Sequence, residues 1–450
     1  MGAAVNSRLI SLLLWMLLAI WSLSNVKGAL DGGYYLYSVS ALPLIVIIYF
    51  IVLKTQKIGG MINIFLFFEL LFFIIVPSRD LTYGIGYWGE DYPDQTVLMY
   101  VNLLIVSATL TVYLFWSIGS RKVIFIKELV IVKRYGLIYL TLLSFFSILI
   151  VLYVYDFNIG QMLFRKYSTF ANSGNERYFH LIINYIVRPT ILLSLMFALY
   201  FFRKSKMVWL SILLISFFSL LGLFPTSVPR FIVGTLYFAV VALIIKKISP
   251  TGLSNLFIFG YISTFSLIGS FRNLESFSNF MLVFKMSASG AYDTYFNFSH
   301  VINQEIVTFG HQLLGVLLFF IPRSIYTDKA VGSGTLLADR ADFVFSNISM
   351  AFLGEGYINF GLAGIFIFAS MLGYLLGYWD KKFSIYRQKN ISSNFMIFYL
   401  MMLPLLFFLL RGDLMTAFSF FCSLLFAYKL VSFLILRRIP ISSSFSTPKN

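Results

Sequence analysis

Long apolar runs follow one another along the whole chain, and short polar or charged segments separate them. A helix of about 20 apolar residues is long enough to cross the hydrocarbon core of a bilayer. The runs are continuous rather than alternating, which argues against an outer-membrane β-barrel. The pattern therefore predicts an all-α polytopic membrane protein.

We expect about twelve membrane-spanning helices. The predicted spans are 9–24, 35–53, 60–77, 96–118, 136–156, 181–202, 207–225, 230–245, 255–271, 350–378, 392–410 and 414–436. The first run follows Arg8 as in a signal sequence, but the later runs favour an uncleaved first helix.

Composition supports this interpretation. The chain is 59% hydrophobic with a mean hydropathy of +0.87, and its net charge is +16. Such a charge invites a nucleic-acid partner, but topology explains it better, so we expect none. Cys422 is the single cysteine, which excludes an intramolecular disulfide and cysteine-based metal sites.

Basic residues concentrate in alternate loops, as the positive-inside rule requires. This places both termini in the cytoplasm. The basic residues on that side are Arg8, Lys54, Lys57, Arg121, Lys122, Lys127, Lys133, Arg134, Arg203, Lys204, Lys206, Lys246, Lys247, Lys381, Lys382, Arg387, Lys389, Arg437, Arg438 and Lys449.

The outer side holds the longer loops, of which the largest is 272–349. Within it, "LLGVLLFFIP" (313–322) is too short to span, so it is either a re-entrant segment or a helix along the interface. We therefore predict one transmembrane domain over 1–436 with this large outer loop, followed by a cytoplasmic tail at 437–450.

Several arginines fall at the outer mouths of the spans or in the large loop. Arginine stays charged and binds phosphate through a planar fork, so a group of them would suit a diphosphate held at the membrane surface. The alternative is that each one snorkels to the interface or pairs with a nearby acid. The candidates are Arg230, Arg272, Arg323, Arg340 and Arg411.

Two further residues are candidates for acid–base chemistry. His311 lies at the edge of the short apolar segment, where it would act as a base or be only a hydrogen-bonded interface residue. Glu355 and Asn359 share a helix face in "FSNISMAFLGEGYINFGLAGI", and Glu355 would pair with an arginine or accept a proton from a sugar hydroxyl. No spacing is typical of a metal site.

The segments "FGHQLLGVLLFFIPRSIYTDKAVGSG", "FSNISMAFLGEGYINFGLAGI" and "RGDL" resemble the O-antigen polymerases (Wzy family) of bacterial envelopes. Over the rest of the chain the resemblance is architectural. It implies a GT-C-like polymerase or ligase architecture and a large periplasmic loop.

The resemblance also implies an activity. Such enzymes are glycosyltransferases of the inner membrane that polymerise repeat units carried on undecaprenyl diphosphate, without a cofactor. They act together with a chain-length regulator protein. Arginines of the outer loops would bind the diphosphate, with His311 or Glu355 as the catalytic base.

Two alternatives remain open at this point. A lipid-linked oligosaccharide flippase, which is no enzyme, would have a similar number of spans, but it would be expected to show similar halves and short loops. An O-antigen ligase would use the same donor with a different acceptor, and the sequence separates it poorly from a polymerase.

Overall fold

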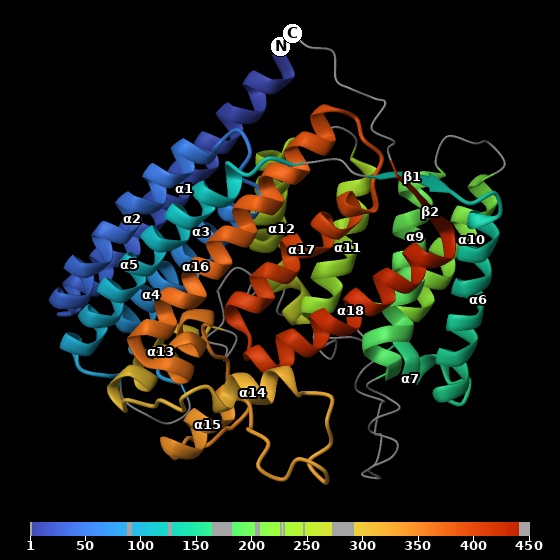
Figure 1. Cartoon of the computed structure of the whole chain (residues 1–450). Helices are drawn as coiled ribbons and strands as arrows, with labels where there is room; N and C mark the ends of the chain where they lie inside the picture. The colour runs from blue at the N-terminus through green and yellow to red at the C-terminus, as the bar shows by residue number, and fades with distance from the viewer. Residues whose placement is uncertain are drawn as a thin grey trace. The chain divides into compact units, whose positions relative to one another are not determined.

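The computed structural model describes residues 2–87, 92–124, 128–163, 182–202, 208–225, 227, 230–245, 248–271 and 292–440. These residues are almost entirely helical, and each of the twelve predicted segments coincides with helix (Figure 1). Nine helices in the described part of the chain are long and apolar enough to cross a membrane, and two shorter apolar helices accompany them. The chain is thus a polytopic α-helical membrane protein, while the number twelve stays a prediction.

The bounds of the elements follow the apolar runs closely. The long helices are α1 (Gly2–Asp31), α2 (Tyr35–Thr55), α5 (Gln95–Ser120), α6 (Gly136–Val154), α9 (Arg188–Phe201), α10 (Trp209–Gly222), α11 (Arg230–Ile244), α12 (Pro250–Phe271), α16 (Phe352–Gln388), α17 (Asn394–Arg411) and α18 (Leu414–Ile435). One predicted span is composite: α3 (Met61–Glu69), the π-helix η1 (Leu70–Ile75) and α4 (Val76–Tyr83). A second π-helix, η3 (Ile183–Val187), leads directly into α9.

The described part of the large loop, 292–349, contains short helices instead of a span. They are α13 (Thr294–Asn303), α14 (His311–Leu317) and α15 (Ser333–Arg340). The short apolar segment begins with α14, and its side chains Leu314, Leu317 and Phe320 are exposed. Seven residues of helix cannot cross a bilayer, so α14 is not a span.

The contacts group the chain into two compact units, whereas the apolar runs predict a single transmembrane domain. Unit 1 comprises 1–122, 249–381 and 406–419, and unit 2 comprises 123–248, 382–405 and 420–450. Helices α16, α17 and α18 therefore belong in part to each unit.

The composite helix α3–η1–α4 forms the centre of unit 1. It is buried over the whole of its apolar length, whereas α1 and α2 expose many apolar side chains. A helix that is apolar on all sides and enclosed by other helices is the expected core of a membrane bundle.

Asp380 fixes the start of this central helix. Its buried carboxylate accepts hydrogen bonds from the backbone N–H of Met61 at 2.8 Å and of Ile62 at 3.3 Å, and from Trp116 Nε1 at 3.0 Å. These amides have no partner inside their own helix, so a carboxylate from α16 caps α3.

The long helix α16 is broken near its start. Phe360 and Gly361 leave helical geometry, and Gly361 has a φ of +60°, which favours glycine. Thr308 N–H donates to the carbonyl of Ile358 at 2.7 Å, and Gly310 N–H donates to that of Asn359 at 2.8 Å. The loop thereby satisfies the carbonyls that the break leaves open.

Unit 2 contains α6, the short α7 (Ile159–Leu163), η3, α9, α10 and α11. It also holds the one two-stranded sheet of the described residues, in which β1 (Glu128–Val132) pairs antiparallel with β2 (Leu436–Pro440). The start of the predicted tail is thus a strand, because the apolar and β-branched residues of "ELVIV" give it a partner. Residues 441–450 lie outside the described part.

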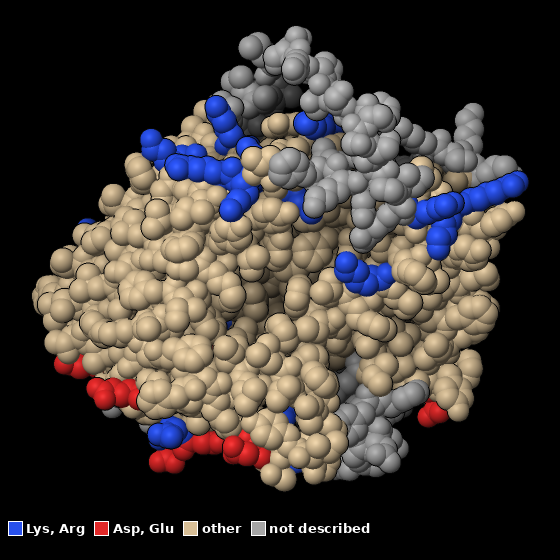
Figure 2. Space-filling view, viewed as in Figure 1, with Lys and Arg blue, Asp and Glu red and all other residues tan. Residues whose placement is uncertain are grey.

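Charge separates along the helices within each unit. On the visible face of unit 1, Figure 2 shows a group of basic side chains at one end, acidic side chains with a few basic ones at the other, and an uncharged belt between them. Basic side chains also gather near β1 and β2 in unit 2. An uncharged belt of this kind is what contact with lipid chains requires.

Candidate functional site

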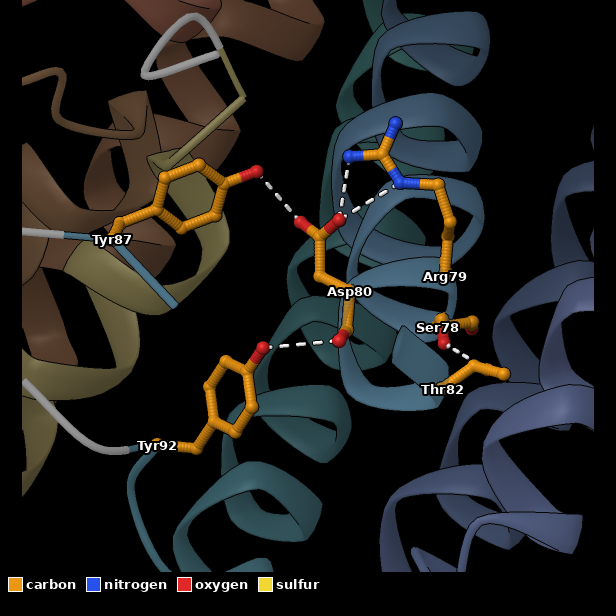
Figure 3. A network of polar contacts seen from close by, with 6 residues as sticks. All are labelled: Ser78, Arg79, Asp80, Thr82, Tyr87 and Tyr92. Atoms are coloured by element: carbon orange, nitrogen blue, oxygen red, sulfur yellow. Dashed lines mark hydrogen bonds and ion pairs between the residues drawn. The ribbon is translucent and has the colours of Figure 1, made fainter. Parts of the chain in front are cut away.

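An arginine–carboxylate pair lies in the middle of α4 in unit 1. Arg79 Nε donates to Asp80 Oδ1 at 2.8 Å, and the hydroxyl of Tyr87 donates to Asp80 Oδ2 at 2.7 Å (Figure 3). The hydroxyl of Tyr92 donates to the main-chain carbonyl of Asp80 at 3.0 Å. Asp80 therefore holds both Arg79 and the segment that follows α4.

Local sequence places this pair. Pro77 lies in the first turn of α4, where a proline is tolerated, and Gly84 ends the helix with a φ of +62°. Burial, reinforced by the negative charge of Asp80, raises the pKa of Tyr87 well above its ordinary value. The phenol thus stays protonated and acts as a donor.

A second pair joins the end of α17 to the start of α13. Arg411 Nη2 lies 3.7 Å from Asp293 Oδ1. The hydroxyl of Ser349 donates to Asp293 Oδ1, and its backbone N–H donates to Oδ2 at 3.3 Å. Burial raises the pKa of Asp293, and the charge of Arg411 opposes this rise.

The two pairs adjoin each other. The guanidinium of Arg79 lies 6.0 Å from the ring of Tyr292, which directly precedes Asp293. The ring of Tyr92 packs 4.7 Å from that of Phe296 in the first turn of α13. We call Arg79, Asp80, Asp293 and Arg411 the paired-arginine cluster.

The cluster presents fixed positive groups at a partly open surface. Both carboxylates are fully buried, whereas the side chain of Arg79 is 12% exposed and that of Arg411 is 30% exposed. Buried acids thus hold two guanidinium groups that reach solvent. Such an arrangement can bind phosphate oxygens, and the neighbouring aromatic rings can pack against sugar faces.

Glu355 lies close to this cluster but is bound on both oxygens. Ser333 donates to Oε2 at 2.6 Å and the N–H of Leu414 donates to Oε1 at 2.8 Å, and the residue is 1% exposed. It therefore joins α15, α16 and α18. Its predicted role as a base stays a prediction, since in this structure its carboxylate is a buried acceptor.

Asp413 completes the turn between α17 and α18. It accepts from the N–H groups of Gly334 at 3.2 Å and of Met415 at 3.0 Å, which ties α15 to the start of α18. Burial raises the pKa of Asp413, and these backbone hydrogen bonds oppose the rise. The turn at 411–414 thus brings Asp413 near the carboxylate of Glu355.

His311 and Arg323 belong to the outer part of the loop. His311 Nε2 bonds the carbonyl of Asp328 at 2.8 Å and lies 3.4 Å from its carboxylate, and the side chain is 38% exposed. Arg323 Nη2 donates to the carbonyl of Ala330 at 2.9 Å, and Lys329 Nζ donates to that of Phe319 at 2.6 Å. Arg323 and Lys329 thus stabilise the loop by donating hydrogen bonds to its own main-chain carbonyls.

The remaining predicted arginines are not brought to the cluster by described contacts. Arg340 ends α15 and is exposed, with no hydrogen bond or ion pair to any residue in the described ranges. Arg230 begins α11 in unit 2, and its side chain is not described. Arg272 lies outside the described residues. Of the predicted arginines, Arg411 alone joins the cluster within the described ranges.

Arg79, Asp80 and Asp293 were not predicted as site residues. The available signal was the dipeptide Arg79–Asp80 at the end of an apolar run, since charges there are costly and functional or paired. Nothing in the sequence indicates that Asp293 meets Arg411, which is 118 positions further along the chain. Among the described residues, no group of three or more His, Cys, Asp or Glu side chains is arranged to hold a metal ion.

Comparison of this chain with protein-family models, with curated proteins and with solved structures finds no match.

Proposed function

We propose that this chain is a membrane glycosyltransferase that polymerises undecaprenyl-diphosphate-linked repeat units of O-antigen or a related surface polysaccharide. The reaction takes place on the periplasmic face of the bacterial inner membrane, with both chain termini in the cytoplasm. The resemblance of the 305–415 region to the O-antigen polymerases and the polytopic helical fold support this proposal.

The paired-arginine cluster is the observation that carries it. Arg79 and Arg411 are held by buried carboxylates and reach solvent at the end of the unit where the large loop folds. A diphosphate on a lipid carrier meets the protein at the membrane surface, where such fixed charges would lie. Preorganised guanidinium groups stabilise the charge that develops on a departing diphosphate without reorganising.

The chemistry is a glycosyl transfer. An acceptor hydroxyl oxygen bonds to the anomeric carbon of the donor sugar, the bond from that carbon to the diphosphate breaks, and the diphosphate leaves on its lipid. The hydroxyl proton passes to a base, for which His311 is the more accessible candidate and Glu355 the buried one. Arg323 and Arg340 lie on the same loop, but described contacts do not bring them to the cluster, so we assign the diphosphate to Arg79 and Arg411.

A deletion strain of the host bacterium tests the proposal. Its surface glycan is separated by gel and compared with that of the parent strain. Loss of a polymerase leaves the lipid A core capped with a single repeat unit, loss of a ligase leaves an uncapped core, and loss of a flippase leaves the lipid-linked unit on the cytoplasmic side. Either of the last two outcomes would replace the proposed activity.

Complementation with point variants tests the cluster itself. We expect Arg79→Gln and Arg411→Gln each to reduce the amount of long-chain glycan at least tenfold. Each substitution removes a charged contact to the diphosphate that is worth about 1.5–3 kcal/mol. Arg121→Gln is the control, because Arg121 is an exposed arginine at the C-terminal end of α5 and is not part of the cluster. If both cluster variants give parental chain length at equal expression, the arginine mechanism is wrong.

A further inference from the structure

A buried arginine in unit 2 lacks a counter-ion among the described residues. Arg188 begins α9 directly after the π-helix η3, and it is fully buried. Its guanidinium donates to Ser227 Oγ at 3.3 Å and to the carbonyl of Met162 at 3.4 Å, both of them long, and Nε has no hydrogen-bond partner among the residues that the structure describes. A guanidinium carries five N–H donors, and contacts within the described ranges use only two of them.

The surroundings make this charge expensive. The ring of Tyr155 lies 4.9 Å from the guanidinium carbon. Tyr155 and Met162 belong to a buried apolar cluster with Val151 and Ile183. An unneutralised charge in such a medium is strongly unfavourable, so buried arginines in membrane proteins mark ion or substrate sites.

A second unsatisfied polar group lies four positions earlier. Asn184 Oδ1, within η3, is buried and accepts no hydrogen bond from the part of the chain that the structure describes. Residues four apart share a helix face, and an amide can turn to present its NH₂ group as a donor. π-Helices occur frequently at functional sites, and this one precedes Arg188 directly.

We propose that Arg188 and Asn184 form a binding site for a phosphate-type anion in unit 2. The anion would accept from the guanidinium and the turned amide, with the Tyr155 ring beneath the guanidinium. The Ser227 hydroxyl donates to the carbonyl of Phe224 at 2.8 Å and keeps that bond. The low dielectric of the apolar cluster strengthens each of these bonds. The site consists of unit 2 residues, whereas the paired-arginine cluster consists of unit 1 residues, and the proposal does not depend on the proposed glycosyl transfer.

The full chain in detergent micelles is the sample for the test. Thermal unfolding is followed with inorganic pyrophosphate, with farnesyl diphosphate and with phosphatidylglycerol, and farnesol is the uncharged control. We expect at least one of the three anions to raise the melting temperature and farnesol to leave it unchanged. A shift with pyrophosphate identifies a free phosphate as sufficient, whereas a shift with only the lipidic anions identifies a head group that needs its chain.

Variants assign the shift to the site. Arg188→Gln and Asn184→Leu should weaken binding of the effective anion about ten- to a hundredfold, since each removes hydrogen bonds to a charged group. Arg134→Gln is the matched control, because Arg134 also lies over a tyrosine ring, 5.5 Å from Tyr135, but at an exposed position. Its anion response should equal that of the unchanged protein.

The anion-free protein gives a second measurement. The substitution Arg188→Gln breaks no ion pair within the described residues. Without anion, the Arg188→Gln protein should therefore melt at the same temperature as the unchanged chain or at a higher one. A lower melting temperature would mean that the guanidinium already has a strong partner, and the proposal would then be wrong. It would also be wrong if no anion shifts the melting temperature, or if the shift persists in Arg188→Gln.

Discussion

At the scale of single residues, His300 shows how burial sets a pH dependence. It lies on α13 with its ring 5.5 Å from that of Phe343, and burial lowers its pKa from 6.5 to about 4. Between these values the unfolded chain binds more protons than the folded one. The neutral ring therefore contributes stability that is complete above pH 6.5 and is lost as the pH falls toward 4. The difference in pKa corresponds to about 3 kcal/mol in the free energy of unfolding between neutral pH and a pH below 4.

We predict that His300→Phe reduces the loss of melting temperature between about pH 7 and pH 4.5. The measurement is thermal unfolding of both proteins in the same detergent across this range. His311→Gln, which changes an exposed histidine of the same loop, should retain the full dependence. An unchanged pH dependence in His300→Phe would show that other groups cause it.

The Arg411–Asp293 pair predicts non-additive mutations. Arg411→Gln alone removes the cation that lies 3.7 Å from the buried carboxyl of Asp293, whereas the double variant with Asp293→Asn removes both charges of the pair. We expect the two changes to compensate by about 1–2 kcal/mol, less than for a fully buried pair because Arg411 is partly exposed. Melting temperatures of all four proteins measure this coupling, and simple additivity would contradict it.

At the scale of elements, α5 and α16 approach through glycine. A Cβ on Gly377 would lie 2.1 Å from the carbonyl oxygen of Trp116, and one on Gly373 would lie 2.3 Å from that of Val112. Small residues let helices in a membrane pack backbone to backbone. A methyl group at either position would push the two helices apart.

Gly377→Ala is therefore expected to destabilise unit 1 by about 1–3 kcal/mol, the usual range for overpacking. Gly260→Ala in α12 is the control, since nothing lies within 4 Å of its added Cβ. It should stabilise the helix by about 0.5–1 kcal/mol. Thermal unfolding in detergent compares the two, and equal melting temperatures would mean that α5 and α16 move apart without loss.

The apolar runs predict these elements well because length and hydropathy suffice for a membrane helix. The breaks are different. The residues of η1, "LLFFII", are as apolar as their neighbours, and the kink at Phe360 depends on loop donors from Thr308 and Gly310. The apolar pattern predicts the helix, but it does not predict that backbone N–H groups from a distant loop bond to the carbonyls at the break.

At the scale of the whole molecule, the same limit explains the site. In lipid, a helix face that meets another helix and a face that meets acyl chains are both apolar, so periodicity carries little information on packing. Ile148 in α6 is buried and Ile138 is 55% exposed, although the two residues are identical. Glu355 and Arg411 were therefore predictable as unusual charges, while the partners Leu414 and Asp293 were not.

Orientation in the membrane is the last quantity that the charges predict. The single cysteine makes a direct measurement simple: Cys422→Ser gives a chain without thiols. Into it, Val344→Cys marks the large loop, at a residue that is 83% exposed, and Lys57→Cys marks the exposed segment between α2 and α3.

With a membrane-impermeant maleimide, we expect the Val344→Cys protein to react in cells whose outer membrane alone is permeabilised. The Lys57→Cys protein should react only after the inner membrane is opened, because the basic segments stay in the cytoplasm. Retained surface glycan in each strain verifies that the proteins are folded. The reverse labelling would place the paired-arginine cluster at the cytoplasmic face, where no periplasmic glycan could reach it. The proposed reaction would then be wrong.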